Sequence, residues 1–170
     1  LDSTKIIRGQ VTASAEDRRK LAFFRVWCLV EIGAALQHSI PVVMKVGSHA
    51  VDPDGSVRFE PNGEMLGRML VMVDVMKAEA TVPADRERIL RQVEEEMGGA
   101  AGLNSLVKGA IVGAIAINAL GLPEVEAAAC GEMEGLGLLP REKMQDVLMA
   151  AAAGGYMCIV EHAIAKGADP

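Results

Sequence analysis

Apolar residues near the start of the chain recur every three or four positions, which is the spacing of one face of an α-helix. The pattern covers residues 21–38 and predicts a helix that ends near His38. Pro41 then favours an extended backbone, and the run Pro41–Val46 predicts a short buried strand. The recurring helical positions are Leu21, Phe24, Trp27, Cys28, Glu31, Ile32, Ala35 and Leu36.

Strand-like and turn-like segments follow. Residues 53–55, Pro-Asp-Gly, are a strong turn signal, and residues 57–60 alternate apolar and polar side chains, so a small hairpin or an ordered loop is expected. Residues 70–73 are continuously apolar and predict a second buried strand beside Pro41–Val46. Asp74, directly after it, either binds a polar ligand or caps a loop.

The second half of the chain has helical periodicity. Residues 84–97 predict one helix, residues 103–120 an almost uncharged second one, and residues 123–133 a short third. The apolar stretch of residues 109–122 is too short to span a bilayer, so we expect a buried helix and no transmembrane span. Gly109 and Gly113 within it predict close helix packing. The fold class is therefore an α/β N-terminal part with short parallel strands, followed by an all-α part.

Composition narrows the classes of function. Among 170 residues 51% are hydrophobic and only 3% aromatic, which is enough for a core made of small and flexible side chains. A net charge of −6, with no run of Lys or Arg, argues against a nucleic-acid partner. Cys28, Cys130 and Cys158 lie far apart without metal-ligand spacing, which indicates reduced thiols in an intracellular compartment, cytoplasm or organelle. Because the chain starts at Leu1, we expect a processed product or a fragment.

Histidine spacing and glycine motifs offer no known catalytic or metal pattern. His38, His49 and His162 fall in separate predicted elements, so no metal site is expected. Residues 47–49, Gly-Ser-His, lack the GxSxG elbow of a serine hydrolase. No phosphate-binding glycine loop and no dinucleotide fingerprint is present, and we expect no bound cofactor.

Residues 25–32, RVWCLVEI, resemble the WCxxE helix of Toll/interleukin-1 receptor (TIR) domains. Residues 40–43, IPVV, resemble the strand that follows that helix. A downstream block within residues 73–104, with VDV, AEAT, ADR, IL and LN, is similar to one found in TIR-like proteins of protists. The resemblance covers roughly the first two-thirds of the chain. It implies a partial TIR-like α/β domain over residues 1–100 and connecting helices over residues 101–139.

In enzymatic TIR domains the glutamate of this motif is the catalytic residue of NAD+ glycohydrolysis, so the resemblance implies that role for Glu31, with NAD+ as substrate. Its carboxylate would stabilise the oxocarbenium-like ribosyl centre as nicotinamide leaves. The strands and loops that hold the nucleotide in that family precede the helix, and few residues precede Trp27 here. A carboxylate without a pocket positions nothing, which favours Glu31 as a surface group paired to a neighbour. Trp27 and Cys28 are expected to anchor the core.

Residues 148–160, LMAAAAGGYMCIV, and the closing KGADP of residues 166–170 resemble an ankyrin repeat. The resemblance implies an ankyrin-like helical repeat over residues 140–170, and we expect Tyr156, Met157 and His162 to contribute to interaction. The usual TPLH start is missing, and Met149 and Tyr156 replace the histidines that brace the turns of such repeats. One repeat cannot bury its own face and needs neighbours.

Two functions of different classes follow. The first is a non-catalytic protein-interaction or scaffold module that is one subunit of a larger assembly. The second is a fragment of a TIR-type NAD+ glycohydrolase, with Glu31 as its catalytic carboxylate. A nicotinamide-release assay separates the two.

Overall fold

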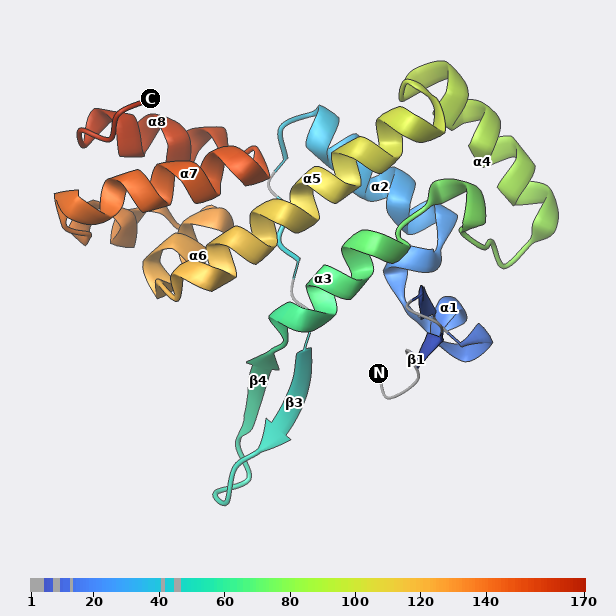
Figure 1. Ribbon diagram of the computed structural model, residues 1–170, viewed down its shortest axis with the longest axis horizontal. Coiled ribbons are helices and arrows are strands. Elements are labelled where there is room, and N and C mark those ends of the chain that lie inside the picture. The colour runs from blue at the N-terminus through green and yellow to red at the C-terminus, as the bar shows by residue number, and fades with distance from the viewer. Residues whose placement is uncertain (1–4, 8–9, 13, 41, 45–46) are drawn as a thin grey trace. The chain divides into compact units, whose positions relative to one another are not determined.

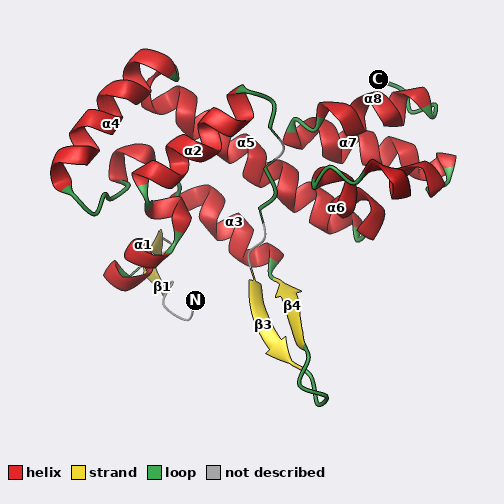
Figure 2. Ribbon diagram, turned by 180° about the vertical axis from the view of Figure 1, so that it is seen from behind, coloured by secondary structure: helices red, strands yellow, loops and turns green. Residues whose placement is uncertain are grey.

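The computed structural model describes residues 5–7, 10–12, 14–40, 42–44 and 47–170, and most of them lie in helices, as Figure 1 and Figure 2 show. The described strands form two antiparallel hairpins. The chain divides into two compact units, each built from two segments. Unit 1 is Leu1–Ile40 with Arg68–Lys108, and unit 2 is Pro41–Gly67 with Gly109–Pro170. This division differs from the three consecutive segments expected from the sequence.

Unit 1 is mainly helical, and its hairpin β1–β2 pairs Ile6 with Val11. Two helices, α3 (Gly63–Met72) and α5 (Gly99–Leu120), continue from one unit into the other. The remaining elements of unit 1 are β1 (Lys5–Ile7), β2 (Gln10–Thr12), α1 (Ala15–Lys20), the 3-10 helix η1 (Ala22–Phe24), α2 (Val26–Gln37), the 3-10 helix η2 (Val75–Lys77) and α4 (Pro83–Glu96). The predicted helix over residues 84–97 is therefore confirmed.

The core of unit 1 takes one face from each of its long helices. Burying one Val, Leu, Ile, Phe or Met side chain stabilises a fold by about 1.5–3 kcal/mol. The side chain of Leu103 in α5 packs against the backbone of α2 at Gly33, since a Cβ built on Gly33 would lie 2.3 Å from Leu103 Cδ1. The buried residues are Phe24, Val26, Leu29, Val30, Met69, Val73, Val75, Ala78, Ile89, Val93, Met97, Leu103 and Val107.

A short parallel bridge between Arg25 and Glu79 fixes the start of α2. The amide of Glu79 donates to the carbonyl of Phe24 over 2.8 Å, and the amide of Val26 donates to the carbonyl of Glu79 over 3.0 Å. These two bonds connect segments more than 50 residues apart in the sequence, and they place Val26 on the buried side of the helix.

Unit 2 combines one hairpin with a helical C-terminal part. The all-helical C-terminal part expected from the sequence is present. Its elements are β3 (Gly47–Val51), β4 (Val57–Pro61), α6 (Pro123–Ala129), the 3-10 helices η3 (Met133–Leu138) and η4 (Arg141–Lys143), α7 (Met144–Gly154) and α8 (Met157–Ala165).

The hairpin confirms one of the two alternatives for residues 47–60. β3 and β4 pair in register from Gly47 opposite Pro61 to Val51 opposite Val57. The turn closes through the amide of Gly55, which donates to the carbonyl of Asp52 over 2.9 Å, and Gly55 has a φ of 85° that favours glycine.

Small residues let two helices of unit 2 touch backbone to backbone. A Cβ built on Gly113 of α5 would lie 1.9 Å from the Cα of Gly154 in α7. Gly109 has no neighbour within 4 Å of such a Cβ. The predicted close packing is therefore confirmed at Gly113 alone. The core around this crossing comprises Ile117, Val125, Ala128, Ala129, Leu136, Met144, Val147, Leu148, Ala150, Ala151, Ile159, Ala163 and Ala168.

Helix α5 is long and apolar enough to cross a membrane by length and composition. It has 22 residues with a mean hydropathy of 1.6 over its most apolar window, of which 39% is buried. The core helix of a soluble protein can have the same length and the same apolar composition.

The predicted pair of parallel strands is wrong. Residues 70–72 end helix α3, because the apolar positions Met65, Leu66, Met69 and Val73 recur at helical spacing and are all buried. Residues 42–44 form no strand, and residues 41, 45 and 46 of the other predicted strand lie outside the described residues.

Candidate functional site

Helix α2 carries Glu31, the carboxylate that the TIR resemblance assigns to catalysis. Glu31 is exposed and has no hydrogen-bond or ion-pair partner among the residues that the structure describes. The predicted pairing to a neighbour is therefore wrong. No described side chain therefore fixes the orientation of the Glu31 carboxylate.

Trp27 lies one helical turn before Glu31 and is 39% exposed. The guanidinium of Arg88 in α4 lies 5.2 Å from the centroid of its ring, which is cation–π distance. The expectation that Trp27 anchors the core is wrong, and Cys28 beside it is only half-buried. The reason is rotational: α2 buries Val26, Leu29, Val30 and Gly33, so Trp27 falls outside the buried face.

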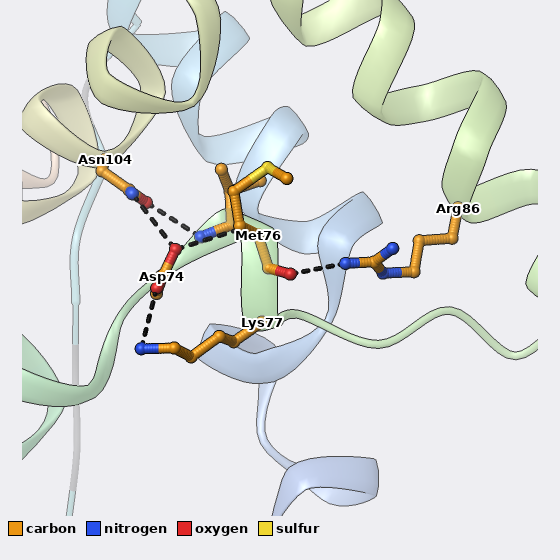
Figure 3. Close-up of polar contacts among 6 residues, drawn as sticks. Asp74, Met76, Lys77, Arg86 and Asn104 are labelled. Carbon is orange, nitrogen blue, oxygen red and sulfur yellow. Dashed lines mark hydrogen bonds and ion pairs between the residues drawn. The ribbon is translucent and has the colours of Figure 1, made fainter.

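Asp74 caps a loop, which confirms that alternative over a ligand site. Its Oδ1 accepts from the amide of Met76 over 3.1 Å, and its Oδ2 pairs with Lys77 Nζ at 3.1 Å, as Figure 3 shows. Asn104 of α5 accepts from the amide of Val75 over 2.9 Å and donates to Asp74. Partial burial raises the pKa of Asp74, but the bonds from Lys77, Met76 and Asn104 outweigh it, and the net pKa is below the ordinary value of 3.8.

Arg86 of α4 completes this polar network. Its Nε donates to the carbonyl of Ala78 over 3.0 Å, and a terminal guanidinium nitrogen donates to the carbonyl of Met76. Arg86 and Asn104 thus provide hydrogen-bond partners for backbone groups of Val75, Met76 and Ala78. The network has a structural role, since its side chains form hydrogen bonds with backbone groups.

The α7–α8 pair holds the residues expected to mediate interaction. Gly155, with a φ of 71°, ends α7 in a left-handed cap, and α8 starts at Met157. Met157 is 58% exposed. The structure adds Met149, which is 65% exposed on α7, and Ile164 on α8. The sequence carried a signal for both additions, because apolar residues at positions that helical periodicity assigns to solvent are unusual.

Tyr156 faces inward rather than outward. Its hydroxyl donates to the carbonyl of Val42 over 3.1 Å, and its side chain lines a small apolar cavity of about 20 Å³ with Val43, Ala114 and Ile117. Burial, with a smaller contribution from Cys130, raises the pKa of the Tyr156 phenol. Tyr156 therefore packs within unit 2, and its expected contribution to interaction stays a prediction.

His162 of α8 is half-buried, and its Nε2 is buried without a hydrogen-bond partner among the described residues. Its expected contribution to interaction stays a prediction. Among the residues that the structure describes, no group of three or more His, Cys, Asp or Glu side chains is close enough to hold a metal ion. The cysteines Cys28, Cys130 and Cys158 are all free.

Gln145 of α7 holds the segment that follows α8. It accepts from the amide of Asp169 over 2.9 Å and donates to the carbonyl of the same residue over 3.1 Å. Gly167, with a φ of 97°, turns the chain toward this contact, and Ala168 is buried against the core. The Gly-Ala-Asp segment is therefore an ordered part of the helix pair.

No protein-family model matches this chain, and neither does any curated protein or any solved structure. The resemblances to TIR domains and to ankyrin repeats therefore rest on the quoted motifs alone.

Proposed function

We propose that this chain is a protein-interaction module that binds a partner protein through α7 and α8, as one subunit of a larger assembly. The observation that carries the proposal is a pair of apolar stripes on the solvent side of two helices whose other sides are already buried. On α7 the stripe is Met149, Ala152 and Ala153, and on α8 it is Met157 and Ile164. We call these five residues the α7–α8 stripe.

The chemistry of the α7–α8 stripe suits a protein partner. Methionine side chains are flexible and polarizable, so they adapt to the shape of an opposing surface. Alanines between them let another helix approach closely. The inner sides of the same helices are filled by residues such as Leu148 and Ile159, so the stripe is a second apolar face and not an exposed part of the core.

An ankyrin-type pairing of α7 and α8 fits this proposal. Repeats of that type stack helix pair on helix pair, and each pair buries its free face against the next one. The left-handed Gly155 and the docked Gly167–Asp169 segment support the likeness. The TIR-like character of the N-terminal part remains a proposal that rests on the WCLVE motif. An intracellular location is part of the proposal, and the free cysteines support it.

The test is a size measurement of the chain in native extract, with matched variants. We expect the parent chain to elute in a complex and the double variant Met149→Glu, Met157→Glu to elute as the free chain. Leu138→Glu is the control, because Leu138 is 85% exposed on η3 and outside the α7–α8 stripe. Free elution of the parent chain, or equal loss of the complex in the Leu138 variant, would refute the proposal. A photo-crosslinker placed at position 149 and at position 138 then identifies the partner.

A further inference from the structure

Unit 1 contains a polar hollow that the proposed function does not use. It has a volume of about 360 Å³ and is lined by Arg19, Arg25, Glu79, Ala80 and Thr81. That volume lies within the range of small-ligand pockets, about 300–1,000 Å³. Two arginines and one hydroxyl against one carboxylate make its lining positive on balance, in a chain whose net charge is −6.

Arg25 is the fixed group of this hollow. One terminal nitrogen of its guanidinium donates to the carbonyl of Arg19 over 3.0 Å, and the other donates to Thr81 Oγ1. Its backbone is held by the bridge to Glu79. A guanidinium has more N–H donors than these two bonds use, and the remaining donors keep the fork geometry that matches a phosphate or carboxylate.

Thr81 is exposed, and its hydroxyl oxygen is held at hydrogen-bond distance from Arg25. An oxygen atom bound to phosphorus at this position would stay within reach of the same guanidinium. Glu79 is half-buried on the wall and has no ion-pair partner among the described residues. The negative charge of Glu79 weakens anion binding, so removing that charge should strengthen the binding of an anion in the hollow.

We propose that the hollow formed by Arg19, Arg25 and Thr81 is a phosphate site. The ligand is a phosphoryl group, which has two possible sources: a free phosphate or phosphorylated small molecule, or a phosphate attached to Thr81 itself. In the second case a kinase transfers the terminal phosphoryl group of a nucleoside triphosphate. The bond from Oγ1 to phosphorus forms, the bond from phosphorus to the bridging oxygen breaks, the nucleoside diphosphate leaves, and the hydroxyl proton passes to the kinase's base.

The two sources are separated by two arms of one experiment on the full chain. In the first arm, inorganic phosphate is titrated and followed by NMR at the Arg25 side chain and the Thr81 amide, with chloride as the control ion. Arg25→Gln should weaken binding about tenfold, because it removes a charge-assisted donor pair. Glu79→Gln should tighten binding by about threefold, since it removes a like charge near the surface.

In the second arm, phosphothreonine is installed at position 81 and its phosphorus resonance is titrated with pH. The second pKa of phosphothreonine is ordinarily about 6. It should be lower beside Arg25 than in the Arg25→Gln background, because a guanidinium favours the dianion. Arg25→Lys should give an intermediate result in both arms, since lysine keeps the charge and loses the fork.

The outcomes decide the proposal and the source. Saturable, Arg25-dependent phosphate binding supports a free ligand, and an Arg25-dependent fall of the second pKa without such binding supports modification of Thr81. Phosphate effects of equal size in the parent and the Arg25→Gln chain, with an unchanged second pKa, overturn the site. If Arg25→Gln does not fold, the exposed Arg19→Gln replaces it, with an expected weakening of about threefold.

Discussion

Gly113 offers a sharp test of how unit 2 is packed. A Cβ at this position would lie 1.9 Å from Gly154 Cα and 2.6 Å from Gly154 N, whereas ordinary contact begins at 3.4 Å. The shortfall of 1.5 Å (3.4 − 1.9) falls on backbone atoms, which cannot rotate away as a side chain can. Gly113→Ala must therefore push α5 and α7 apart.

Two opposing effects determine how much Gly113→Ala changes the free energy of unfolding. Overpacking a tight contact costs about 1–3 kcal/mol, and occasionally more when backbone has to move. Replacing glycine by alanine inside a helix returns about 0.5–1 kcal/mol. We therefore expect Gly113→Ala to lower the free energy of unfolding by about 1–2 kcal/mol, while Gly109→Ala, which meets open space, raises it by about 0.5–1 kcal/mol.

Urea unfolding of the full chain measures both variants. Tyr156 is the only tyrosine and belongs to unit 2, whereas Trp27 is the only tryptophan and belongs to unit 1, so the two signals follow the two units separately. The Tyr156 transition of Gly113→Ala should move to lower urea. A Gly113→Ala midpoint at or above that of Gly109→Ala would refute the backbone contact.

Four further outcomes are expected. Asn104→Ala should destabilise unit 1 by about 1–3 kcal/mol, because it leaves the Val75 amide without its acceptor, and hydrogen exchange at that amide should speed up. Asp74 has a lowered pKa, so its contribution to stability is fully present above the unfolded value, near 3.8, and is lost as the pH falls through the lower folded value; Asp74→Asn should flatten acid unfolding in that range. Trp27→Ala should cost only about 1–2 kcal/mol, less than emptying a buried aromatic site, as urea titration will show. Glu31→Gln should leave nicotinamide release from NAD+ unchanged, and parent turnover that disappears in this variant would favour the enzyme instead.

The helical second half was predictable because its signals are long and consistent. The α4 pattern repeats over 14 residues, starts at Pro83 and stops at paired glycines. The β3–β4 turn was equally readable, because Pro-Asp-Gly has a specific turn chemistry. Such elements can be predicted from a short stretch of sequence, because the residues that determine them lie within about a dozen positions.

The strand assigned to residues 70–73 failed for the opposite reason. Four consecutive apolar residues fit a buried strand and the end of a buried helix equally well. Met65, Leu66 and Met69 decide for the helix, since they continue its buried face toward the N-terminus. The choice between strand and helix therefore depends on residues that precede this apolar run.

The orientation of Trp27 depended on a contact with a distant segment. Periodicity alone allows either of two neighbouring faces of α2 to be buried, since both carry apolar residues. The bridge from Arg25 to Glu79 selects the face with Val26 and Leu29. Likewise, the hollow around Arg25 and Thr81 joins residues 56 positions apart, and no local motif announces it.

The interleaved order of the two units has a consequence for synthesis of the chain. All segments of unit 1 have been translated once Lys108 is made, whereas the Pro41–Gly67 segment of unit 2 must wait for Gly109–Pro170. At about 5–20 residues per second, the wait for these last residues, about 100 beyond Gly67, is about 5–20 s. Throughout that time Met44 and Leu66, both buried in the finished fold, lack the later segment of their unit. The nascent chain should therefore be a chaperone client on the ribosome until its C-terminal helices emerge.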